Sequence, residues 1–183
     1  MATVFPGTTI EVSKLTRESS RTLFNGIFAA GGITLSQVSI MTGLEPYMIQ
    51  NWVKRGFVSS PVKKVYSKEQ FARIVIINML RETLHIEKIC NLIKIIIGDP
   101  KDTSDDLIKD DELYHIYVDM ISDSSININD EDSVTNAARS ATRGFASNSP
   151  TSKKRLVGIL RIMLYAHAAA ELKKSADQIL SSL

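Results

Sequence analysis

The chain has a single cysteine and no long uninterrupted apolar run, and each absence excludes a class of protein. Cys90 is the only cysteine among 183 residues, so the chain cannot be a secreted scaffold held by internal disulfides. The apolar stretch that begins at Leu156 is interrupted by Arg161 and His167 and falls short of the ~20 apolar residues of a membrane span. The first residues lack the basic and apolar regions of a secretion signal. We therefore expect a cytoplasmic protein with no membrane contact.

The motifs of enzymes and metal sites are missing as well. There is no glycine-rich loop that would hold a phosphate and no cysteine or histidine spacing of a zinc site. The histidines, His85, His115 and His167, fall on three separate expected helices, whereas nucleophilic catalysis needs a base beside a nucleophile. A calcium loop after Asp123 is excluded because Ile128 stands where such loops need glycine. We expect a protein that is not an enzyme and has no cofactor and no metal.

The residues that are present predict a mainly α-helical globular protein. Apolar residues make up 44% of the chain and charged residues 23%, which is typical of soluble domains. The apolar residues recur at intervals of three and four in most segments, which is the helical period. Only Val58–Tyr66 combines β-branched residues with a turn, which is marked by Pro61. That segment therefore predicts a small two-stranded wing.

The stretch from Thr34 to Gly56 predicts two short helices joined by a tight turn. Thr34 and Gln37 have the spacing of a capping box that opens the first helix. Gly43 suits the left-handed residue that ends a helix, and Pro46 suits the first turn of the next one. Gly56 then ends the second helix. This arrangement can place its second helix in the major groove of DNA.

The second helix has an apolar side and a polar side. Ile49 and Val53 are four residues apart and form the inward stripe, next to Trp52 as a core anchor. The residues left for the outer face are Tyr47, Gln50, Asn51, Lys54 and Arg55. Amides of this kind can bond adenine, while lysine and arginine bind guanine or phosphate. The alternative is the solvated polar face that any surface helix has.

Basic residues of the expected wing favour the DNA-binding alternative. Lys63 and Lys64 lie near its tip, and we expect them to contact phosphate. Between residues 34 and 68 the chain has one acid, Glu45, against five bases, a net charge of +4. Local charge matters more for phosphate binding than the net +2 of the chain.

The residues of this region resemble the winged-helix DNA-binding domain of MerR-type regulators. The resemblance rests on the blocks GLEPYMIQNWVKRGFV and VKKVYSKEQFARIVIINMLRETLHIEKI. The residues at matching positions are Pro46, Trp52, Arg55, Gly56, Lys64, Tyr66 and Ser67. The sequence is more similar still to an uncharacterised bacterial domain family of that MerR-like type, over residues 34–98 and more loosely to 121. Gln50 departs from the MerR pattern, which has a DNA-contacting arginine there, and no long heptad segment follows the domain.

This resemblance implies a DNA-binding transcriptional regulator, with a recognition helix at about 45–55 on double-stranded DNA. The alternative is a protein-interaction module that kept a winged fold without DNA binding. The two differ in whether the basic face is continuous or is covered by an acidic segment. That segment, residues 99–132, has twelve acids and two bases and contains an expected helix from Asp110 to Ile121. Its acidic face can be solvated, can repel DNA, or can dock on a basic surface of the same chain.

The rest of the chain is expected to be helical as well. We divide it into an N-terminal helical extension (1–33), the winged helix-turn-helix (34–98), the acidic helical segment (99–132), and a linker with a C-terminal apolar helix (133–183). The Leu156–Leu180 helix is apolar on nearly all sides at its start, so it must be buried on several sides. We expect it to hold a homodimer. The alternative is that it lies in the core of the monomer.

Overall fold

The fold is mainly helical, as the sequence predicts. The computed structural model of the chain describes residues 3–97, 107–123, 125–145 and 150–183, so part of the expected acidic segment and linker lies outside the described residues. The helices in these ranges are α1 (Ser19–Ile27), α2 (Leu35–Thr42), α3 (Pro46–Lys54), α4 (Lys68–Leu80), α5 (Ile86–Ile97), α6 (Asp110–Ile121), α7 (Glu131–Ala141) and α8 (Pro150–Ser181). The strands are β1 (Thr3–Val4), β2 (Glu11–Val12), β3 (Ile33–Thr34) and β4 (Val65–Tyr66).

The helix boundaries near α2 and α3 follow from local capping chemistry. The side chain of Thr34 accepts a hydrogen bond from the Gln37 amide, and the Gln37 side chain accepts one from the Thr34 amide. The expected capping box is therefore confirmed. Gly43 ends α2 with a φ of 69°, a left-handed conformation that glycine adopts at little cost. Pro46 occupies the first turn of α3, where its missing N–H has no helical partner to lose.

The two-stranded sheet in this region differs in its pairing from the expected wing. Strand β4 pairs with β3, which precedes α2, and the registered pairs are Ile33 with Tyr66 and Thr34 with Val65. Within Val58–Tyr66 itself, a single bridge joins Val62 to Val65. No sequence pattern predicts β3, because two residues are too few to show a strand period.

The N-terminal extension contains a β-hairpin in addition to the expected helix. Strands β1 and β2 pair in an antiparallel way, and the loop between them packs on α2 and α4. The Thr9 amide donates to the Met41 carbonyl, and the Asn78 side chain donates to the carbonyls of Gly7 and Thr42. Residues 1–33 are therefore not wholly helical, in contrast to the expectation from the sequence. The hairpin fastens the end of α2 to the central helix α4.

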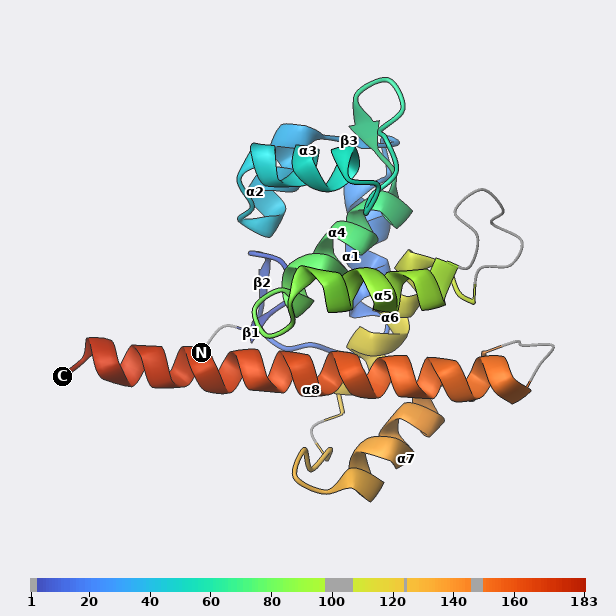
Figure 1. Cartoon of the computed structure of the whole chain (residues 1–183), viewed down its shortest axis with the longest axis vertical. Helices are drawn as coiled ribbons and strands as arrows, with labels where there is room; N and C mark the ends of the chain where they lie inside the picture. Colours follow the sequence, from blue (N-terminus) through green and yellow to red (C-terminus); the bar gives the residue numbers. More distant parts are fainter. Residues whose placement is uncertain (1–2, 98–106, 124, 146–149) are drawn as a thin grey trace.

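The core is centred on α4 and α6, with α1 and α8 packed around them (Figure 1). Phe24 of α1 lies between Phe71 of α4 and Tyr114 of α6, with ring centroids 5.4 and 5.5 Å from its own. The Tyr114 hydroxyl donates to the Pro6 carbonyl, which ties the N-terminal hairpin to the same core. Within the described ranges, none of the helices has the length and apolarity needed to cross a bilayer.

The C-terminal region differs most from expectation. Residues 131–141, mostly assigned to a linker, form helix α7, which Asp130 caps by accepting hydrogen bonds from two amides. Helix α8 runs across the molecule between α7 and the other helices, and its C-terminal half extends beyond them (Figure 1). Its first half contributes Leu156, Leu160 and Met163 to the core with no exposed surface. Part of the expected dimer helix is therefore core of the monomer.

Candidate nucleic-acid interface

Helix α3 presents one polar face to solvent. Tyr47, Gln50, Asn51 and Lys54 are all exposed, and their spacing of three and four places them on one side of the helix. Tyr47 is the most prominent, with 68% of its surface exposed. The face therefore combines an aromatic hydroxyl, two planar amides and an ammonium group. Such groups can bond base edges and phosphates.

The opposite face of α3 is fixed in the core, as predicted. Ile49 is fully buried and Trp52 is 6% exposed. Beyond the helix, the Phe57 amide donates to the Trp52 carbonyl, and the guanidinium of Arg55 lies 4.8 Å from the centre of the Phe57 ring. Arg55 is exposed but held against that ring, so it stands beside the polar face of α3 rather than in its centre. A helix anchored in this way presents its outer side chains in a defined geometry.

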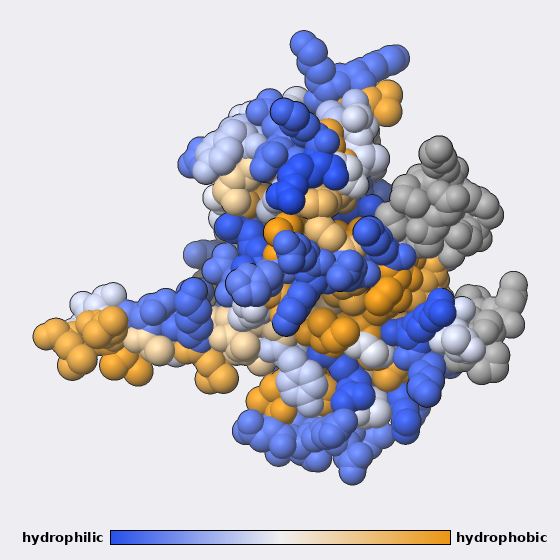
Figure 2. Space-filling model, in the orientation of Figure 1, coloured by the Kyte–Doolittle hydropathy of each residue, from blue (hydrophilic) through white to orange (hydrophobic). Residues whose placement is uncertain are grey.

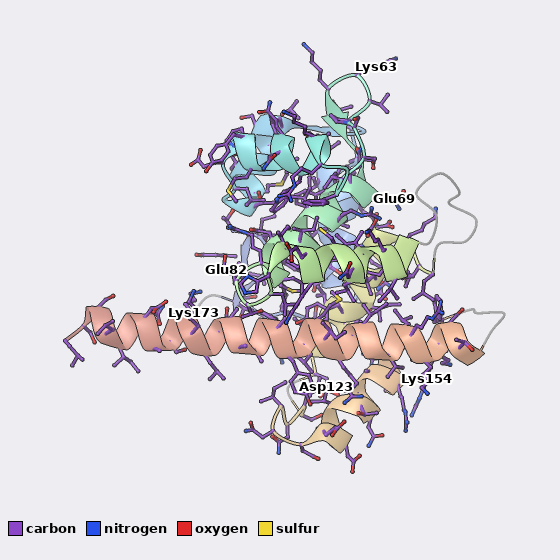
Figure 3. The ribbon with its side chains drawn as sticks, in the orientation of Figure 1. Lys63, Glu69, Glu82, Asp123, Lys154 and Lys173 are labelled. Atoms are coloured by element: carbon purple, nitrogen blue, oxygen red, sulfur yellow. The ribbon has the colours of Figure 1, made fainter. Side chains whose placement is uncertain are left out.

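Lys63 and Lys64 lie at the tip of the turn that precedes β4. The Val65 amide donates to the Val62 carbonyl, and Lys63 and Lys64 between them have φ values of 51° and 65°. Two positive φ values define a type I′ turn, in which asparagine and glycine are usual and lysine is disfavoured. We call residues 62–65 the lysine turn. Lys63 extends away from the body of the molecule (Figure 3).

Neighbouring residues fasten the lysine turn to the scaffold. Gln70, in the first turn of α4, donates to the carbonyls of Ser59 and Ser60 with the amide nitrogen that its capping box leaves free. On the other side, β4 pairs with β3. Gly32 packs so closely that a Cβ there would lie 2.9 Å from the Tyr66 carbonyl oxygen. The turn is thus fixed on both sides, by Gln70 before it and by the pairing of β4 with β3 after it, while its tip stays in solvent.

The acids of α6 bind bases elsewhere and leave this face open. Asp111 pairs with Lys68 at 2.9 Å, and its hydrogen bond and charge raise the pKa of that lysine. The other acids of α6 that form ion pairs are Asp110 with Arg73, and Glu112 and Asp119 with Arg21. Among the described residues, no ion pair involves Lys54, Arg55, Lys63 or Lys64. The acidic helix therefore docks within its own chain and does not cover these four bases.

The structure brings most of the predicted site residues to one end of the molecule. The α3 face and the lysine turn both lie at the end opposite α8 (Figure 1), where hydrophilic side chains dominate the surface (Figure 2). Sequence reasoning missed the second role of Gln70 and the exposure of Val62, which is 71%. The paired serines before Pro61 were the only signal for the Gln70 contact. No sequence signal indicated the pairing of β4 with β3.

Comparison with known proteins finds a family match for part of the chain, and that family has no assigned activity. Residues 32–117 match the family described as "Domain of unknown function (DUF1836)". The match includes α3 and the lysine turn, and it excludes the N-terminal hairpin, α7 and α8. No curated protein and no solved structure matches the chain. The expected similarity to an uncharacterised domain family is confirmed for this stretch.

Proposed function

We propose that the protein binds double-stranded DNA as a transcriptional regulator, with α3 in the major groove and the lysine turn on the phosphate backbone. The observation that carries this proposal is the open cationic face: Lys54, Lys63 and Lys64 are exposed, and α6 directs its acids toward other bases. An acidic cover over this face would have favoured a protein-interaction module. Exposed bases beside an exposed polar helix face favour phosphate binding.

The proposed contacts are of two kinds: some bind the phosphate backbone, and others recognise bases. Lysine turn residues are flexible point charges at a projecting tip, so they bind phosphates without reading sequence. Gln50 and Asn51 carry planar amides on the exposed face of α3, where bidentate bonds to adenine discriminate among bases. Tyr47, near the start of α3, contributes a hydroxyl that can bond a phosphate. The MerR-like, winged arrangement suggested by the sequence blocks is part of this proposal.

We also propose that the protein acts as a homodimer through the outer side of α8. Its exposed apolar residues recur every three or four positions, which is heptad spacing that the sequence interpretation missed. They are Ile162, Tyr165, Ala169, Leu172, Ala176 and Ile179, and we call them the α8 seam. Between residues 162 and 183 the two acids and two bases cancel, so a second copy meets no charge repulsion. Paired copies would read paired half-sites on DNA.

Selection from a random DNA pool tests this function. The parent protein is expected to enrich a defined site, and Gln50→Ala is expected to relax the preference at one or two positions by ~1–3 kcal/mol. Thr22→Ala, on the exposed surface of α1, is the matched control and should enrich the same site as the parent. If the parent enriches no sequence, base reading by α3 is wrong.

The alternative function is a protein-interaction module that binds no DNA. The exposed α8 seam favours it, because such a surface can equally receive a helix of another protein. The two functions predict different losses. Charge removal at the lysine turn would leave a pure interaction module unaffected, whereas it would weaken every DNA complex of a regulator.

A further inference from the structure

A second basic surface lies where α7 ends and α8 begins. Two arginines at the end of α7 and three bases in the first turns of α8 contribute to it, and α7 packs against α8. These residues are Arg139, Arg143, Lys153, Lys154 and Arg155, and we call them the α7–α8 corner. Lys154 lies near the start of α8 on the side of α7, far from the labelled Lys63 (Figure 3). The corner is therefore separate from the α3 face and the lysine turn.

The stretch of sequence that contains the corner has bases but no acid. Residues 133–170 carry six bases and no acid, which exceeds the net +4 of residues 34–68. In the part of the chain that the structure describes, Arg161 is the one base of this stretch with an ion pair, to Glu131. Arg143 also shares a hollow with Asp119 and Asp123, so the three corner bases that lie on α8 are the least compensated of the five. A concentration of like charge on this scale attracts polyanions.

Helices α7 and α8 differ in where their acids and bases lie relative to the helix ends. Helix α7 begins with Glu131 and Asp132 and ends with Arg139, the order that stabilises a helix through its dipole. Helix α8 has no acid in its first turn and three bases directly after it, which is the destabilising order. The helix dipole therefore does not stabilise bases at this position, whereas binding to an anion would use them.

The chemistry of the corner fits a phosphate backbone better than a protein or a lipid. Protein interfaces have an apolar or aromatic centre, and membrane-bound helices place apolar residues beside their bases. Among the described residues of the corner region, no large apolar side chain is exposed before Ile162. Three of the five bases are arginines, whose planar guanidinium binds phosphate through two hydrogen bonds.

We propose that the α7–α8 corner binds the phosphate backbone of duplex DNA without sequence preference, as a second DNA contact remote from α3. This extends the proposed function and rests on it for the choice of duplex DNA, but it does not require that α3 reads bases. It gives one protein molecule two separate attachments, either to two parts of a bent duplex or to two duplexes.

A salt series on a random-sequence duplex tests the corner. The corner variant is Lys153→Ala/Lys154→Ala/Arg155→Ala, and its control, Lys88→Ala/Lys173→Ala/Lys174→Ala, removes the same charge from exposed positions elsewhere. We expect the corner variant to lower the slope of log affinity against log salt by about two to three units, since each phosphate contact contributes roughly 0.9. The control should keep the parent slope. An unchanged slope in the corner variant would overturn the proposal.

The same series with Lys63→Ala/Lys64→Ala, alone and combined with the corner variant, separates the two surfaces. Independent losses in both backgrounds support both DNA contacts. A loss only at the lysine turn overturns the corner and leaves the proposed function standing, whereas a loss only at the corner supports the corner and removes the proposed function. Vesicles with anionic lipid form a further arm. If the corner variant weakens vesicle binding but leaves DNA binding unchanged, the surface binds membranes and the proposal is overturned.

Discussion

Lys63 and Lys64 have backbone conformations that are unfavourable for lysine. A lysine with positive φ costs more than asparagine or glycine at the same place, yet Lys63 and Lys64 occupy both central positions of the type I′ turn. Disfavoured backbone conformations are retained where function requires the side chain. At this turn the function we infer is to carry two positive charges on a narrow tip.

The double variant Lys63→Asn/Lys64→Gly should therefore separate stability from function. We expect it to raise the free energy of unfolding by about 1 kcal/mol, because both residues suit the turn. We also expect it to weaken DNA binding and to lower the salt slope by about two units, because two phosphate contacts are lost. Urea unfolding and a DNA titration measure the two effects. A variant that is more stable and binds DNA as well as the parent would show that the lysines do not grip phosphate.

Two histidines, the buried His115 and the half-buried His167, predict how stability depends on pH. Burial, followed by the charge of Arg21, lowers the pKa of His115, and burial lowers the pKa of His167. The unfolded chain, with histidine pKa values near ~6.5, then binds protons more readily than the folded chain. Stability is thus fully present above about pH 6.5 and is lost as the pH falls through that value toward the folded pKa. Urea unfolding between pH 5 and pH 8 measures this slope.

Asparagine variants assign that slope to particular residues. His115 and His167 each use Nδ1 in a hydrogen bond, with Ser20 at 2.9 Å and Tyr117 at 2.8 Å. An asparagine amide can approximate Nδ1, so His115→Asn and His167→Asn should each flatten the pH dependence. The same change at His85, which is exposed, is the control. Equal slopes in all three variants would mean that other groups titrate in this range.

At the scale of elements, capping chemistry was readable from the sequence and pairing over distance was not. The capping box of Thr34, the helix end at Gly43 and the burial of Trp52 depend on residues close in sequence, and all were predicted. Helix α7 was missed because its composition is dominated by small and polar residues, although Asp130 gave a correct N-cap signal. The β3–β4 pairing joins segments more than thirty residues apart, which no local period reveals.

The close packing of the N-terminal hairpin on α4 makes Gly7 sensitive to substitution. Gly7 has a φ of 73°, and a Cβ there would lie 2.2 Å from the Val75 carbonyl oxygen of α4. Gly7→Ala should lower the free energy of unfolding by at least ~2 kcal/mol, from the clash together with the positive φ. Gly26→Ala, in α1 with open space around it, is the matched control and should stabilise by ~0.5–1 kcal/mol. If both variants unfolded like the parent, the hairpin would not be clamped on α4.

At the scale of the whole molecule, the two halves of α8 have different roles. The first half is core: Leu156 and Leu160 are fully buried. The second half stands clear of the body, where Leu172 is 71% and Ile179 is 64% exposed. Orange surface along this projecting end marks the apolar side chains (Figure 2). The sequence predicts that α8 is buried on several sides, because it is apolar on nearly all of them. Only the fold shows which of its apolar residues lie in the core and which are exposed.

Self-association through the α8 seam should therefore be removable without unfolding the monomer. We expect the parent to sediment as a dimer at micromolar concentration and Leu172→Glu/Ile179→Glu to sediment as a folded monomer, because charges in a coiled-coil seam oppose pairing. Lys174→Glu, on the opposite side of the helix, should remain a dimer. If the parent protein stays monomeric, the α8 seam does not bind a second copy of this chain.

One titration shows whether the α3 face and the lysine turn together bind DNA. The affinity of the parent protein is measured for its selected duplex and for a scrambled duplex, from about 50 to 200 mM salt. We expect binding to both duplexes at low salt, a linear fall of log affinity with log salt, and tighter binding to the selected duplex throughout. Absence of binding to either duplex at the lowest salt would contradict this expectation.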